Sequence, residues 1–146
     1  MIQKVEPQNT EDKYSILYIE DNKDLLDFIS HKFSTEYTFF SSDGTDAVEK
    51  ALELIPDIII CDLNLPEMNG FQICETLKKD LRTSHIPTII LTASDDQDSY
   101  LKALDSGADI FLTKPFNLKV LAQSIKGLLF NREKLRFYYT NNIVNI

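Results

Sequence analysis

Side chains that could do chemistry stand where short apolar runs of the sequence end. In chain order they are Glu20, Asp21, Asp62, Thr92 and Lys114. Magnesium prefers oxygen ligands and is usually held by one or two carboxylates together with phosphate oxygens. A lysine ammonium and a threonine hydroxyl suit a phosphoryl group, and a carboxylate can attack phosphorus to form an acyl phosphate. If these side chains meet, they could bind magnesium and place a phosphoryl group on Asp62.

Asp62 follows the unbroken apolar run 58–61 and precedes a loop with a proline and a glycine. This pattern predicts a strand buried on both faces that delivers Asp62 to its carboxyl end. An ionised carboxylate buried there costs several kcal/mol unless a cation or fixed dipoles compensate it. The sequence offers two sources of compensation, a divalent cation bound with Glu20 and Asp21, or the ammonium of Lys114.

The elements that must position these residues alternate along the chain. From Tyr14 onward, short apolar runs alternate with stretches of helical period, which predicts an α/β domain with a parallel sheet. The strands are expected at 16–19, 37–40, 57–62, 88–92 and 110–114. Parallel strands end at one edge of the sheet, so the residues that close the first, third, fourth and fifth strands should converge.

Each strand is expected to be followed by an amphipathic helix. Asn22 and Asn117 are the expected N-caps of the first and last helices, Pro56 ends the second, residues 94–96 open the fourth, and Gly107 closes it. The expected buried positions are Leu25, Leu26, Ile29, Phe33, Ala47, Val48, Ala51, Leu52, Ile55, Phe71, Cys74, Leu77, Leu81, Tyr100, Leu101, Leu104, Leu118, Leu121, Ile125 and Leu128.

The composition is that of an acidic globular domain. The 146 residues carry a formal net charge of -8, and 43% are hydrophobic, enough for one domain with a real core. The negative charge argues against direct binding of nucleic acid or an anionic membrane by this chain, so proteins and cations are the expected partners. No apolar run approaches the length of a membrane span. Cys61 and Cys74 are expected to be buried, reduced thiols, which fits the cytoplasm.

Three regions are expected along the chain. Residues 1–13 lack periodicity and should form a flexible leader or linker. Residues 14–130 hold the alternating strands and helices. Residues 131–146 are expected to form a helical extension or linker, because the last helix is expected to run on through 131–136.

Taken together, residues 15 to about 130 resemble the receiver domain of two-component response regulators. Each motif is weak alone, but all four in order at strand ends make a specific match. The motifs are Glu20-Asp21, the stretch Asp62-Leu-Asn-Leu-Pro-Glu-Met-Asn-Gly70, Thr92-Ala93 and Lys114-Pro115-Phe116. The resemblance implies a flavodoxin-like, doubly wound (βα)5 three-layer sandwich with strand order 2-1-3-4-5 and a site at the switch point between the first and third strands.

The resemblance also implies a ligand set. Magnesium would be bound by the side chains of Asp21 and Asp62 and by the main-chain carbonyl of Asn64, and Glu20 would hold a coordinated water. Asp62 would be the phospho-acceptor.

Further roles follow from the same resemblance. Lys114 would pair with Asp62 and then with a phosphoryl oxygen, and Thr92 would move toward the phosphoryl group. Phe111 occupies the position of the family's aromatic switch. The Lys114-Pro115 bond would be cis, since X-Pro is the usual site of cis peptides.

The implied function is that of a switch rather than an enzyme. A histidine kinase would donate the phosphoryl group from a phosphohistidine to Asp62, and the chain would assist only its own phosphorylation and dephosphorylation. The altered face of the fourth helix, fifth strand and fifth helix would then act on an output domain or protein partner. A homodimer is compatible with the resemblance. One dimer of the family pairs an acidic residue with an arginine on the last helix, and this chain has Val120 and Ser124 at those positions, which argues against that dimer. A module of a longer regulator or hybrid kinase is favoured over a stand-alone receiver.

Other interpretations are open at this stage. An aspartyl-phosphate-forming phosphatase is an alternative function, but it would need a general acid where the chain has Asn64. A flavin-binding module would need a phosphate-cradling loop after the first strand, where this chain is acidic. Glu20 and Asp21 could be plain helix-start acids, and Phe111 could equally be an ordinary core aromatic.

Overall fold

The computed structural model describes residues 13–93 and 97–144. Most of the expected leader, and the polar start of the fourth helix at 94–96, therefore lie outside the described residues. The described chain divides into two compact units between Lys114 and Pro115. The first unit holds the whole sheet and four helices, and the second holds the last helix.

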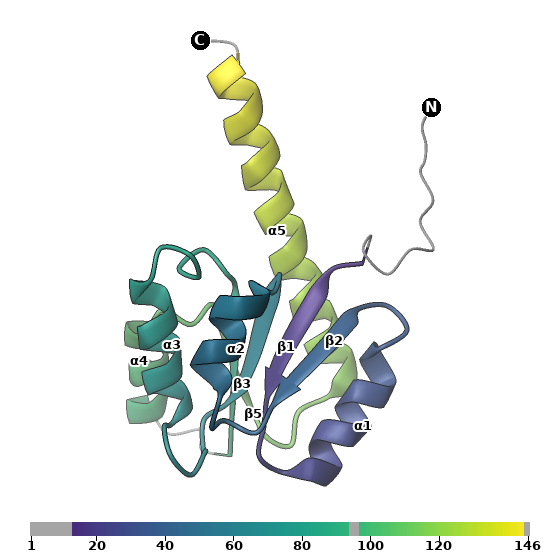
Figure 1. The fold of residues 1–146 in the computed structure, drawn as a ribbon, viewed down its shortest axis with the longest axis vertical. Helices are drawn as coiled ribbons and strands as arrows, with labels where there is room; N and C mark the ends of the chain where they lie inside the picture. Colours follow the sequence, from purple (N-terminus) through teal and green to yellow (C-terminus); the bar gives the residue numbers. More distant parts are fainter. Residues whose placement is uncertain (1–12, 94–96, 145–146) are drawn as a thin grey trace. The chain divides into compact units, whose positions relative to one another are not determined.

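The sheet is parallel and has the predicted strand order, β2-β1-β3-β4-β5 (Figure 1). Its strands are β1 Ser15–Ile19, β2 Thr38–Ser42, β3 Ile58–Asp62, β4 Thr88–Thr92 and β5 Ile110–Thr113. Every neighbouring pair runs parallel, so the carboxyl ends of all strands lie at one edge, the lower edge in Figure 1. The predicted doubly wound, flavodoxin-like α/β fold is thereby confirmed.

β2 departs from its predicted range of 37–40. It begins at Thr38 and continues to Ser42, which pairs with Ile19 of β1. The backbone ladder extends beyond the apolar segment because its hydrogen bonds do not require apolar side chains. Tyr37, just outside the strand, is still buried. The centroid of its ring lies 6.3 Å from that of Phe33.

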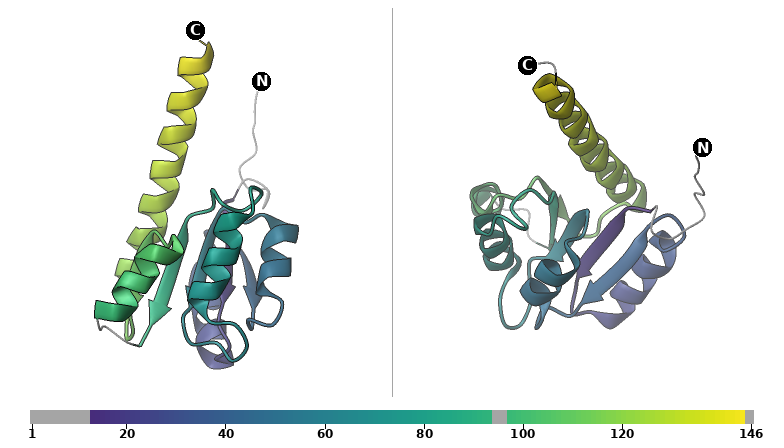
Figure 2. Two further views of the ribbon diagram at one scale, coloured as in Figure 1. Left: turned by 90° about the vertical axis from the view of Figure 1, so that its left-hand side faces the viewer. Right: turned by 45° about the horizontal axis from the view of Figure 1, so that its top comes forward.

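The helices of the first unit are α1 Lys23–Phe33, α2 Ala47–Leu54, α3 Gly70–Lys79 and α4 Gln97–Ser106, and the second unit is built on α5 Leu118–Val144. α2 and α3 share one core cluster with β1 and β3, and α1 contacts β2. Figure 2 shows the ribbon from two further directions. The cluster consists of Leu17, Ile19, Ala47, Ala51, Ile59, Cys61, Leu65, Ile73, Leu77 and Ile86. None of the helices in the described ranges is both long and apolar enough to cross a membrane.

Several predicted helix ends are confirmed. The side chain of Asn22 accepts a hydrogen bond from the Leu25 amide at 3.1 Å, and that of Asn117 accepts one from the Lys119 amide at 2.7 Å. Gly107 follows α4 with a φ of 94°, a left-handed conformation that glycine adopts without strain.

The predicted buried faces of α3 and α4 are partly wrong. Leu81 is 89% exposed because α3 ends at Lys79, and Ile73, which was not predicted, is buried. Tyr100, Leu101 and Leu104 were expected to be buried, but each is about half exposed. α4 instead buries the small residues Ala103 and Ser106, and α4 contacts α3.

The end of α2 also differs from the prediction. Ile55 was placed on the buried face, but it is 39% exposed. It forms the C-cap of α2 in the left-handed region, with a φ of 44°. The helix has therefore already ended one residue before Pro56, whose ring disfavours a helical conformation at the residue that precedes it.

Candidate functional site

The chemically active residues predicted from the sequence all lie at the carboxyl edge of the sheet. Asp62 and Thr92 are the last residues of β3 and β4, and Glu20 and Lys114 directly follow β1 and β5. Backbone hydrogen bonds hold these ends in place, since the Lys114 amide donates to the Thr92 carbonyl at 2.6 Å and the Glu20 amide donates to the Ser42 carbonyl at 2.9 Å. The sheet ladder itself therefore positions the site.

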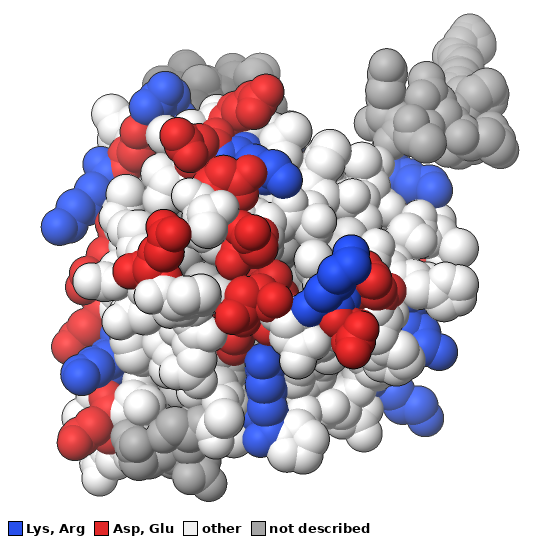
Figure 3. Space-filling view, turned by 60° about the horizontal axis from the view of Figure 1, so that its bottom comes forward, with Lys and Arg blue, Asp and Glu red and all other residues white. Residues whose placement is uncertain are grey.

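An acidic cluster forms the centre of this edge. Glu20, Asp21 and Asp62 each present a carboxylate oxygen, and these oxygens lie within 4.8 Å of one another. Glu20 and Asp62 are buried and Asp21 is exposed, so the cluster opens to solvent on one side. Figure 3 turns the lower edge of Figure 1 forward and shows acidic side chains gathered on this face.

Lys114 compensates the buried acids. Its Nζ lies 3.1 Å from Asp62 Oδ1 and 3.3 Å from Glu20 Oε1. Burial alone would lower the pKa of Lys114, but the contacts with Asp62 and Glu20 outweigh it, so the pKa of this ammonium is raised. The lysine therefore stays charged beside the two carboxylates.

Glu20 is held at both of its oxygens. Oε2 accepts a hydrogen bond from the Asn22 amide at 3.2 Å. Oε1 accepts hydrogen bonds from the Tyr18 hydroxyl and from Lys114 Nζ, both at 3.3 Å. Burial and the nearby Asp62 charge raise the pKa of Glu20 despite these contacts. Burial and the Glu20 charge likewise raise the pKa of Tyr18.

The acidic cluster fits a hard divalent cation. Its donors are carboxylate oxygens, the ligand type that magnesium prefers. Asp62 Oδ1 is buried and accepts no hydrogen bond of good geometry within the described chain, although Lys114 lies within ion-pair distance of it. Lys114 contacts two of the three carboxylates of the cluster, those of Asp62 and Glu20. Among the described residues the cluster therefore has more negative charge than the positive charge that contacts it, and a cation could neutralise the excess.

The loop between β3 and α3 closes against the end of β3. The Gly70 amide donates to the Leu63 carbonyl at 2.9 Å. A Cβ on Gly70 would lie 2.7 Å from the Asp62 carbonyl oxygen, closer than real contacts allow. Only glycine therefore lets α3 begin this close to the backbone of Asp62.

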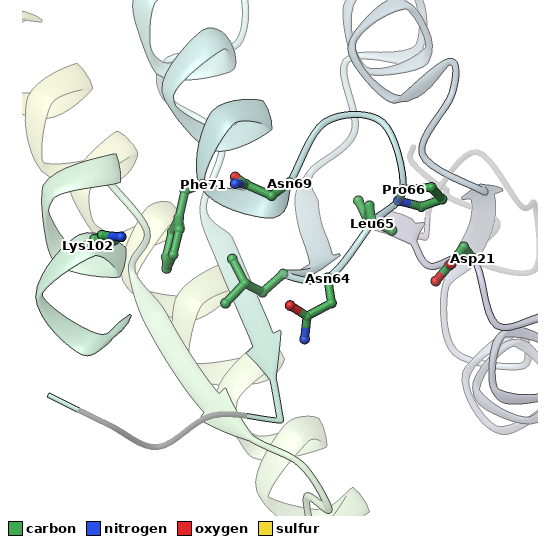
Figure 4. Close-up of a pocket in the computed structure, with 8 residues that line it drawn as sticks. Asp21, Asn64, Leu65, Pro66, Asn69, Phe71 and Lys102 are labelled. Atoms are coloured by element: carbon green, nitrogen blue, oxygen red, sulfur yellow. The ribbon is translucent and has the colours of Figure 1, made fainter. Parts of the chain in front are cut away.

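A cavity of about 500 Å³ lies beside the cluster. Asp21 lies on one side of it, Phe71 and Lys102 lie on the other, and Asn64 and Leu65 of the loop lie between them (Figure 4). Asn64 is exposed. The site is therefore accessible from solvent next to Asp21.

Thr92 and Phe111 lie in β4 and β5, and their roles as switch residues stay predictions. Thr92 is fully buried at the end of β4. Phe111 is half-buried in β5, and its ring meets that of Tyr100 of α4 edge-on, with centroids 5.9 Å apart. The cis geometry of the Lys114-Pro115 bond stays a prediction.

Sequence reasoning missed two residues. Tyr18 was assigned only to a strand, although it stands two residues before Glu20 and such positions share a face of a sheet. Lys102 lines the cavity, but nothing in the sequence indicated this position, because the prediction for α4 used only its large apolar residues. Strand alternation could have found Tyr18.

Comparison with known proteins places these observations in context. The family model described as "Response regulator receiver domain" matches residues 16–126. A histidine kinase from Formosa agariphila is 37% identical over 131 residues, which cover 89% of this chain and 10% of the kinase. The chain spans 51% and 25% of the lengths of two further curated relatives, both regulators.

Solved structures give the same picture. The receiver domain of a signal transduction histidine kinase from Syntrophus aciditrophicus is 34% identical, with a TM-score of 0.73, covering 81% of this chain and 91% of that one. The receiver domain of a sensor histidine kinase from Pseudomonas aeruginosa is 26% identical, with a TM-score of 0.74, covering 80% of this chain and 98% of that one. That second structure has a magnesium ion coordinated in its active-site cleft.

Proposed function

This chain belongs to the response regulator receiver domain family, and from that premise we propose that Asp62 accepts a phosphoryl group from the phosphohistidine of a histidine kinase. The observation that carries the proposal is the 3.1 Å contact between Lys114 Nζ and Asp62 Oδ1, within the acidic cluster at the strand ends. A carboxylate held this way has a cation in place for the incoming phosphoryl charge.

The transfer would use Asp62 as the nucleophile. One carboxylate oxygen would attack phosphorus as the bond between phosphorus and the donor imidazole nitrogen breaks. The imidazole keeps the electron pair of that bond and takes up a proton, and Asp62 becomes an acyl phosphate. Lys114 would then shift its contact from Asp62 to a phosphoryl oxygen, because the charge that it neutralises has moved there.

The same residues would hold magnesium. Asp21, Asp62 and the main-chain carbonyl of Asn64 would be its ligands, and Glu20 would hold one of its waters. Bound there, the ion would neutralise charge on the transferring phosphoryl group. Two observations support this assignment: the cluster offers only oxygen ligands, and the buried Asp62 Oδ1 accepts no hydrogen bond of good geometry from the part of the chain that the structure describes.

The output would pass through α4 and β5. Thr92 would move toward the phosphoryl group, and Phe111, which contacts Tyr100, would carry the change to α4. Leu101 and Leu104 on that helix are about half exposed, and such apolar side chains suit a protein partner. An output domain or separate regulator is the proposed target.

The chain would act as a switch and not as a turnover enzyme. A phosphatase that used Asp62 would need a proton donor for the leaving group. Asn64, two residues further on, has an amide that cannot supply one. The receiver would therefore assist only its own phosphorylation and dephosphorylation.

We propose residues 14–130 as the receiver and 131–146 as a helical connection within a longer regulator or hybrid kinase. The family match over 16–126 and the continuation of α5 to Val144 support these bounds. The relatives are longer than this chain, which supports its being one module of a longer protein. A cytoplasmic location suits the free, buried Cys61 and Cys74.

Phosphoryl labelling tests the proposal. The chain is incubated with magnesium and phosphoramidate, a small donor with a phosphorus–nitrogen bond, and its intact mass is measured. We expect one added phosphoryl group that hydroxylamine removes, as it does from an acyl phosphate. Asp62→Asn should abolish the addition, whereas Asp27→Asn, at an exposed position of α1, should leave it unchanged. Equal labelling of Asp62→Asn and wild type would refute the assignment.

A further inference from the structure

Tyr18 is a fully buried tyrosine whose hydroxyl reaches the acidic cluster. It lies in β1 and is 0% exposed. Its hydroxyl donates to Glu20 Oε1 at 3.3 Å. Buried tyrosine hydroxyls normally find a partner, but this partner belongs to the functional site.

The fold leaves Tyr18 little freedom to point elsewhere. Positions two apart in a strand share a face of the sheet. Glu20 follows β1, but its amide continues the backbone ladder to the Ser42 carbonyl, so Tyr18 and Glu20 share a face, and Leu17 and Ile19 lie on the other. The ring of Phe39 in β2 packs edge-on against Tyr18, with centroids 6.1 Å apart. The phenol is thereby fixed beneath Glu20.

Tyr18 supplies a contact that does not depend on Lys114. Glu20 Oε1 accepts from both the phenol and the ammonium. When Lys114 turns to a phosphoryl oxygen, as in the proposed function, Oε1 keeps the phenol and Oε2 keeps the Asn22 amide. Both Glu20 oxygens then still have a donor.

We propose that Tyr18 is a positioning residue of the magnesium site, acting by orienting the Glu20 carboxylate that holds a coordinated water. This inference rests on the proposed function and adds a residue to it. Groups that orient the ligands of a metal commonly change affinity by 10- to 100-fold when removed. The phenol contact is long, so we expect the lower end, about tenfold.

Magnesium affinity measured by calorimetry on the folded chain tests the role. Tyr18→Phe removes only the hydroxyl, and we expect it to weaken magnesium binding about tenfold. The matched control is Tyr37→Phe, the same change at another buried tyrosine, which lies beside Phe33. This control should leave magnesium affinity unchanged even if it alters stability.

A double-mutant cycle tests the route through Glu20. If Tyr18 acts by orienting Glu20, Tyr18→Phe should have no further effect in a Glu20→Ala background. An equal loss of affinity with and without Glu20 would overturn the inference.

Comparing the magnesium affinities of the two tyrosine variants is enough to test the role of Tyr18, because neither substitution introduces a new group. Unchanged affinity in Tyr18→Phe, or equal losses in both variants, refutes the role of Tyr18 while leaving the proposed function intact. No magnesium binding by the wild-type chain would instead refute the metal site of the proposed function.

Discussion

Replacing Lys114 by methionine removes the only cation that contacts the buried carboxylates among the described residues. Methionine keeps an apolar stem of similar length but has no charge. Glu20 and Asp62 would remain buried close to each other without compensation. We therefore expect Lys114→Met to destabilise the fold when magnesium is absent.

The size of the effect follows from the distances. At an effective dielectric constant of about 20, unit charges about 3 Å apart attract by about 5 kcal/mol before solvation is counted. Removing one partner of a buried ion pair costs about 3–5 kcal/mol in measured cases. The Lys114 side chain is 24% exposed, so water screens it in part. We expect a loss of about 2–3 kcal/mol, or a melting temperature lowered by about 5–10 °C.

Urea unfolding followed by circular dichroism, in chelator and in magnesium, checks this prediction. Magnesium stabilises the folded state by about 2.7 kcal/mol at 100 times its dissociation constant. Without Lys114 the cluster is more negative, so magnesium should bind more tightly and the deficit of Lys114→Met should shrink. Lys119→Ala, at an exposed lysine of α5, is the control and should be near neutral. Wild-type stability of Lys114→Met in chelator, or a deficit that magnesium does not reduce, would refute the reasoning.

Three further predictions concern the same edge of the sheet. Gly70→Ala should lower the free energy of unfolding in urea by about 1–3 kcal/mol and weaken magnesium binding, because the added Cβ would collide with the Asp62 carbonyl. The control is Gly127→Ala in α5, where a Cβ meets nothing within 4 Å; it should instead stabilise the helix by about 0.5–1 kcal/mol. Thr92→Val should retain Asp62 phosphorylation in the mass assay but lose the phosphorylation-induced change in hydrogen exchange of α4. The pKa of Glu20 is raised above 4.5 in the fold, so the ionisation of Glu20 opposes folding. The free energy of unfolding of the wild type should therefore rise relative to that of Glu20→Gln as the pH falls from neutral toward 4.5. A fall over the same pH range would contradict burial as the cause of the raised pKa.

The position of the site could be predicted because it depends on topology rather than on side-chain packing. In a parallel sheet the residues that close the strands must converge, so Asp62 and Lys114, far apart in the chain, could be expected at the same edge. The strand order and the pairing of these two residues came from the resemblance to receiver domains. Their observed contact at 3.1 Å agrees with that argument. The contact of Tyr18 with Glu20 does not follow from strand order. Strand alternation places the two residues on one face, but only the position of the hydroxyl distinguishes this tyrosine from an ordinary core residue.

The buried face of α4 shows a different limit. Hydrophobic periodicity selects large apolar residues, and it selected Tyr100, Leu101 and Leu104. The helix instead buries Ala103 and Ser106, and small side chains let two helices approach closely. Periodicity reports which face is apolar, but it does not report what covers that face.

This mismatch bears on the proposed output. Large apolar side chains that are about half exposed lose part of the stabilisation that burial would give them, and a protein partner that covered α4 would restore it. Tyr100 is one of them, and it contacts Phe111 of β5, the strand that directly precedes Lys114. In the proposed function, a change at the Lys114 end of β5 would pass through the contact between the Phe111 and Tyr100 rings to the apolar side chains of α4.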